Sequence, residues 1–89
     1  MFNIQGDEMK YIALYNMTMT TDIVWVMARV REVRLCKDVK TDWEMVRRTL
    51  GNCREEGIMS LQEVYVYGNK PSDNIKTEIE NMGVTIIYY

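Results

Sequence analysis

Short stretches in which apolar and polar residues alternate indicate strands at three places along the chain. Residues 10–16, KYIALYN, alternate and are rich in β-forming residues, which places Tyr11 and Tyr15 on one face of a strand. Residues 61–67, LQEVYVY, place two valines on one face and two tyrosines on the other. Residues 84–89 form a last strand. Tyrosine therefore recurs on all three predicted strands.

A helix is the clearest prediction for the middle of the chain. Thr41 and Glu44 match the S/T-x-x-E capping box, in which each side chain bonds the backbone N–H of the other residue. Gly51 weakens a helix interior by about 1 kcal/mol relative to alanine, so the helix ends there or continues to Glu56, with Gly57 as its left-handed stop. The apolar residues of this stretch form one stripe: Trp43, Val46, Leu50 and Cys53.

A second helix is predicted after the strand at 61–67. Ser72 or Asp73 can cap its first turn, and Gly83 ends it. Its apolar residues again share one face: Ile75, Ile79 and Met82.

The segment from Ile23 to Cys36, IVWVMARVREVRLC, fits two interpretations. Its first half is β-branched and aromatic, which favours a strand. Helical spacing also connects its apolar residues, but Arg34 would then fall within the apolar stripe. We favour one long strand, with a helix as the alternative. In that interpretation residues 17–22 form a hairpin loop.

The order of elements predicts a small two-layer α/β sandwich. Strands and helices follow as β-β-α-β-α-β, which gives a mixed sheet of three to four strands with two helices on one face. The other face of the sheet stays open. We expect one domain over residues 10–89, preceded by a flexible N-terminal extension at residues 1–9. We find no internal repeat.

Composition narrows the chemistry that this domain can perform. The 89 residues include no histidine and two cysteines, Cys36 and Cys53. A histidine-based catalytic triad and a closed four-ligand zinc site are therefore excluded, and we expect no catalytic residues, metal or cofactor. No apolar run is long enough to span a membrane, and we expect a cytoplasmic protein. A non-enzymatic binding module, regulatory or inhibitory, fits these observations better than an enzyme.

The tyrosines supply the first candidate surface. If the valines at 64 and 66 lie under the helices, the tyrosines of the same strand point away from them. The run from Ile23 to Ala28 is apolar on both sides, and such a strand needs both of its faces covered. We therefore expect a homodimer, or a complex with another protein, through a face formed by Tyr11, Tyr15, Trp25, Tyr65, Tyr67 and Tyr89.

Basic residues supply an alternative, because seven of the eleven lie between residues 29 and 48. Together with the sheet tyrosines they would bind nucleic acid, although the pI near 5.1 is low for such a domain. The residues of this second candidate site are Arg29, Arg31, Arg34, Lys37, Lys40, Arg47, Arg48 and Lys70.

A weaker alternative is a small phosphate site at the carboxyl ends of the strands. Parallel sheets bind ligands at that edge, where the start of the helix near Thr41 and residues 68–72 would meet Lys37 and Lys40. The loop lacks the glycines of a P-loop.

Overall fold

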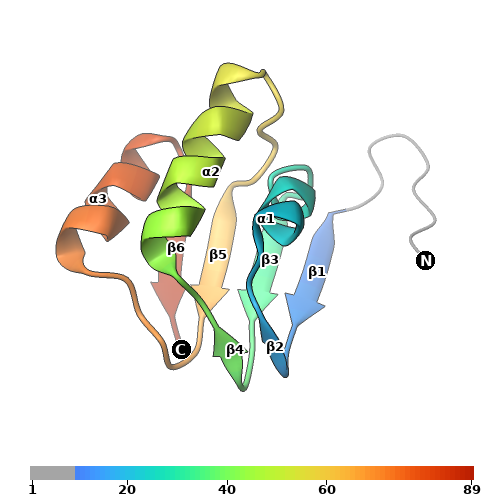
Figure 1. Ribbon diagram of the computed structural model, residues 1–89, viewed down its shortest axis with the longest axis vertical. Helices are drawn as coiled ribbons and strands as arrows, with labels where there is room; N and C mark the ends of the chain where they lie inside the picture. Colours follow the sequence, from blue (N-terminus) through green and yellow to red (C-terminus); the bar gives the residue numbers. More distant parts are fainter. Residues whose placement is uncertain (1–9) are drawn as a thin grey trace.

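The computed structural model describes residues 10–89 and consists of two layers, a sheet and a set of helices (Figure 1). The predicted extension at residues 1–9 lies outside the described part. Four strands form the sheet in the order β1-β3-β5-β6, and every pairing is parallel. Their bounds are β1 Tyr11–Leu14, β3 Glu32–Leu35, β5 Glu63–Val66 and β6 Thr85–Tyr88. The two-layer α/β arrangement is confirmed, but with parallel pairings rather than a mixed sheet.

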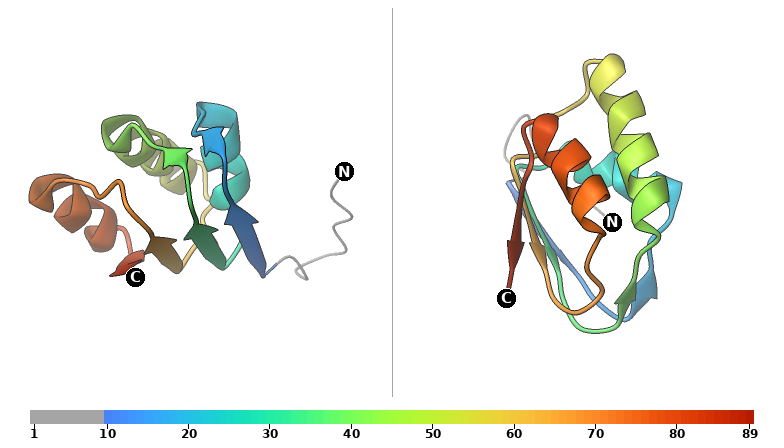
Figure 2. Two further views of the ribbon diagram at one scale, coloured as in Figure 1. Left: turned by 90° about the horizontal axis from the view of Figure 1, so that it is seen from below. Right: turned by 90° about the vertical axis from the view of Figure 1, so that its left-hand side faces the viewer.

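Among residues 10–89, three helices cover one face of this sheet and none lies on the other face (Figure 2). They are α1 Thr21–Met27, α2 Trp43–Glu55 and α3 Asp73–Asn81. The prediction of two helices on one face missed α1. Two further short strands, β2 Met17–Thr18 and β4 Val39–Lys40, pair in parallel beyond the ends of β1 and β3.

The prediction of one long strand from Ile23 to Cys36 is wrong, because the segment divides into α1 and β3. Thr20 starts the helix, since its Oγ1 accepts the backbone N–H of Ile23 at 3.3 Å. The predicted hairpin loop at 17–22 is replaced by β2 and the first residues of this helix. Burying one apolar side of α1 therefore outweighs the β propensity of its residues.

Helix α2 begins one residue later than the predicted capping box implies. Asp42 is the N-cap, and its carboxylate accepts the backbone N–H of Met45 at 3.2 Å. Thr41 lies before the cap, and Glu44 forms an ion pair with Arg47 instead of returning to a capping residue. The helix passes through its internal glycine and ends at Glu55.

The other helix boundaries agree with the predictions. Ser72 caps α3, because its Oγ accepts the backbone N–H of Ile75 at 3.3 Å. Gly57 and Gly83 follow α2 and α3 with φ of 75° and 94°, the left-handed conformation that glycine adopts without strain.

The strands repeat one structural unit along the chain. The four neighbouring strands of the sheet share one register position, and a helix follows each of the first three strands. The residues at this position are Tyr11, Glu32, Glu63 and Thr85. This corrects the expectation of no internal repeat. Unequal spacing, longest between β3 and β5, conceals the repeat in the sequence.

Within two of these units the apolar positions have the same spacing. The residues are Val30, Val33 and Leu35 in one unit and Leu61, Val64 and Val66 in the next, and all six are buried. The units stack side by side in the manner of a short solenoid, and each packs mainly against its neighbours.

Candidate functional site

The uncovered sheet face carries a continuous group of aromatic side chains. Because successive residues of a strand point to opposite faces, the residues between the buried valines and leucines point away from the helices. We call the following group the tyrosine face: Tyr11 of β1, Arg34 of β3, Tyr65 of β5, Tyr67 directly after β5, and Tyr89 directly after β6.

Arg34 lies at the centre of the tyrosine face. Its guanidinium carbon lies 4.6 Å from the ring centroid of Tyr65 and 5.9 Å from that of Tyr11, within the range of cation–π contacts. Its Nε donates to Oε2 of Glu32 at 3.3 Å, and this hydrogen bond raises the pKa of Arg34 above its ordinary value. The arginine therefore connects β1, β3 and β5 on this side of the sheet.

Tyr89 closes the other end of the face. Its ring lies 6.4 Å from that of Tyr65, edge to face, and 5.6 Å from that of Tyr67. Its hydroxyl donates to the carbonyl oxygen of Leu35 at 3.3 Å. The neighbouring Cys36 side chain and, to a smaller extent, desolvation raise the pKa of Tyr89 above its ordinary value.

The rings of the tyrosine face remain open to solvent. Tyr11, Tyr67 and Tyr89 are 52%, 52% and 53% exposed, and the helices all lie on the opposite side of the sheet (Figure 2). Contiguous exposed aromatic groups of this kind are typical of interaction surfaces rather than of ordinary protein surface.

One residue of the predicted interface lies elsewhere. Trp25 is in α1, where it packs against the core and not on the sheet face, because the predicted strand is a helix. Tyr15 follows β1 directly and is 62% exposed, beside the left-handed Asn16. Tyr88 lies in register with Val66, on the helix side, and Lys70 Nζ lies 4.7 Å from its ring centroid.

The structure does not bring the predicted basic residues together. Only Arg34 lies on the tyrosine face. Arg47 is held in the helix layer by Glu44 and by Glu78, whose Oε1 lies 3.8 Å from its Nη1. The remaining ones are spread over four places: Arg29 and Arg31 between α1 and β3, Lys37 and Lys40 after β3, Arg48 on α2, and Lys70 after β5.

The edge predicted to hold a phosphate is occupied by contacts within the fold. The Asn69 side chain donates to the carbonyl oxygen of Thr41 at 2.8 Å, and Trp43 Nε1 donates to the carbonyl oxygen of Asn69 at 2.9 Å. The carboxylate of Asp42 caps the nearby helix and repels an anion. These residues therefore connect neighbouring units of the solenoid.

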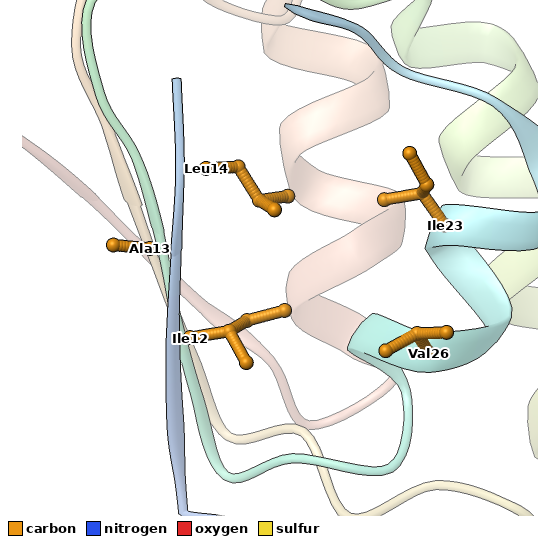
Figure 3. Close-up of a pocket in the computed structure, with 5 residues that line it drawn as sticks. All are labelled: Ile12, Ala13, Leu14, Ile23 and Val26. Atoms are coloured by element: carbon orange, nitrogen blue, oxygen red, sulfur yellow. The ribbon is translucent and has the colours of Figure 1, made fainter. Parts of the chain in front are cut away.

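An apolar pocket of about 340 Å³, which the sequence analysis did not predict, lies between β1 and α1 (Figure 3). Ile12 and Leu14 of β1 point toward Ile23 and Val26 of α1, whereas Ala13 points to the other side of the strand. The alternation of β1 combined with the helical interpretation of residues 23–36 would have indicated these facing residues.

Residues 10–89 contain no group of three or more side chains suited to hold a metal ion. Cys36 and Cys53 are free thiols. No helix in this part of the chain has the length and apolar character to cross a membrane. Comparisons with family models, with curated proteins and with solved structures found no match.

Proposed function

We propose that this chain is a non-enzymatic protein-binding module and that the tyrosine face is its binding surface. The observation that carries the proposal is the contiguous, half-exposed aromatic group around Arg34 on a sheet face that no described element covers. Tyrosine and arginine are the side chains most enriched at the energetic centres of protein interfaces. Solenoids also present extended surfaces of this kind to their partners.

The geometry favours a protein partner over nucleic acid. Nucleic-acid binding needs several cations to neutralise phosphates next to the stacking rings. The tyrosine face has one arginine, and a glutamate accompanies it at hydrogen-bonding distance. The other basic residues of the 29–48 segment lie at the ends of the strands or in the helix layer.

The apolar run from Ile23 to Ala28 does not favour a homodimer. It lies in helix α1 and its C-cap rather than in a strand that needs cover on both faces, and α1 buries Val24 and Met27 within the fold. A different protein is therefore the proposed partner, and self-association becomes an outcome that sedimentation velocity distinguishes.

The test replaces two half-exposed rings of the face, Tyr11→Ser with Tyr67→Ser. A photoreactive phenylalanine analogue at position 67 first crosslinks the partner in cells that express the chain, and the identified partner is then purified. Calorimetry should show affinity weakened by about tenfold or more in the double variant, because these rings lose their buried contact area.

Tyr88→Ser is the matched control, since it removes a tyrosine that lies on the helix side of the sheet. Its affinity should stay within about twofold of the unaltered chain. Equal affinity of the double variant and the unaltered chain would refute the proposal, as would a homodimer in which the face is the contact.

A further inference from the structure

The open edge of β1 differs from every internal position in the sheet. Among residues 10–89, β1 pairs with β3 on one side only, whereas β3 and β5 have a strand on each side. The carbonyl oxygens of Lys10 and Leu14 point toward β3 and accept the N–H groups of Glu32 and of Cys36, directly after β3, at 2.9 and 2.8 Å. Since bonding direction alternates along a parallel strand, the backbone groups of Tyr11 and Ala13 point to the open edge.

The apolar pocket lies on the helix side of this same strand. In the neighbouring strands of the sheet, the helix side carries pairs of aliphatic residues that are separated by a single residue. Val33 and Leu35 of β3 form one such pair, and they lie in register with Ile12 and Leu14. Val64 and Val66 of β5 form the next one, and all four are buried.

The pocket is therefore the place that the aliphatic pair of one more strand would fill. A strand added in parallel at the open edge, in the same register, would direct two side chains toward Ile12, Leu14, Ile23 and Val26. All five residues that line the pocket are apolar, so it offers no side-chain group to a polar ligand.

We infer that the open edge of β1, together with this pocket, binds an extended segment of a partner protein as an added parallel strand. The segment carries two aliphatic side chains one residue apart, as β3 and β5 do. Main-chain hydrogen bonds hold it at the edge, and the aliphatic pair enters the pocket. The pocket lies on the opposite side of the sheet from the tyrosine face, and the edge shares only the backbone of Tyr11 with that face, so the inference stands independently of the proposed function.

A second copy of the chain fits this site less well. Among the described residues the other sheet edge belongs to β6, whose inward pair is Ile86 and Tyr88. Tyr88 carries a hydroxyl, and Lys70 lies over its ring. The wholly apolar pocket would have to receive that polar group without a hydrogen-bond partner.

The probe is a synthetic peptide of residues 31–37 with Cys36→Ser, because this segment already pairs in parallel with β1 on its other side. NMR titration of the isotope-labelled full chain should give saturable shifts in the amides of β1 and the methyl groups of the pocket. The same peptide with Val33→Asp and Leu35→Asp should bind about tenfold or more weakly, since its side chains cannot enter the pocket.

Ala13→Pro in the chain tests the edge itself. Proline removes an N–H that points away from β3, and edge strands tolerate this change. Peptide binding should be lost, whereas Ala13→Val should keep it. Ile23→Lys, which places a charge beside the pocket, provides the same test from the helix side if Ala13→Pro fails to fold.

Several outcomes would overturn the inference. Equal binding of the two peptides would do so, as would shifts confined to the tyrosine face or to β6. So would the absence of any shift at millimolar peptide, or concentration-dependent shifts of β1 without peptide, which indicate a contact between copies.

Discussion

Cys53 illustrates how a single buried residue ties stability to pH. It lies on the apolar side of α2 and is fully buried, and this burial raises the pKa of its thiol above the ordinary value. Arg29 acts in the opposite direction with a smaller effect. The folded protein therefore keeps the thiol proton to higher pH than the unfolded chain does.

We expect the free energy of unfolding to fall as pH rises through the ordinary thiol pKa, about 8.5. In that range the unfolded chain has released the proton and the folded one has not, so alkali favours unfolding by at most about 1.4 kcal/mol per pH unit. Urea unfolding under reducing conditions between pH 7 and 9.5 measures this. Cys53→Ala should lose the thiol's contribution, whereas Cys36→Ala should retain it; identical pH profiles for all three chains would contradict the explanation.

At the residue scale the sequence predicts which side chains are buried better than it predicts their partners. The apolar stripe with Trp43 and Cys53 is buried as expected. The partner of Glu44 is not the expected one, because Arg47 one turn later competes for its carboxylate. The N-cap is the residue whose side-chain oxygen reaches a free N–H of the first helical turn. Thr41 and Asp42 are adjacent and can both do this, so the packing of the helix decides which of them caps it.

At the scale of the element, the start of α2 gives a direct comparison of these two candidates. Asp42→Ala should lower the free energy of unfolding by about 1 kcal/mol, because it leaves the N–H of Met45 without its acceptor. Thr41→Ala should cost less, since the contact that Thr41 makes with Asn69 uses its backbone carbonyl oxygen. Urea unfolding at pH 7 compares the two, and a larger loss for Thr41→Ala would restore the predicted capping box.

The elements that the sequence analysis identified are those with their own local signals. Helix α3 has a serine cap, an apolar face and a terminal glycine, and all three lie where predicted. Helix α1 has seven residues rich in β-branched and aromatic side chains, so local preference opposes its conformation. Apart from its Thr20 cap, α1 is stabilised by its packing against the neighbouring units, and a single-sequence pattern does not contain that contribution.

At the scale of the molecule, the parallel order of the sheet follows from the repeated strand–helix unit. The alternation of strands and helices predicts the two layers and the open sheet face. The alternation of side chains along β5 places its tyrosines on that face. This alternation within the strands is sufficient to locate most of the candidate site. The pocket beside β1 could not be predicted in this way, because two of its five lining residues come from the misassigned α1.

A solenoid of this kind should open from its ends rather than as one unit. Strands β3 and β5 have a neighbour on each side, whereas β1 and β6 have one among the described residues. Hydrogen exchange measured by NMR should therefore be slowest in β3 and β5, by about tenfold or more relative to β1 and β6.

Paired variants at the two ends make this prediction specific. Leu14→Ala removes a partly buried side chain from β1, and Ile86→Ala removes one that is 6% exposed in β6. Each should accelerate exchange mainly in its own strand and the neighbouring helix, because lost packing weakens the nearest interface of the stack most. If either variant accelerates exchange equally in all four strands, the fold opens as a single cooperative unit. The end that opens more easily should be the β1 end, where the pocket leaves Ile12 and Leu14 without an aliphatic neighbour on their outer side.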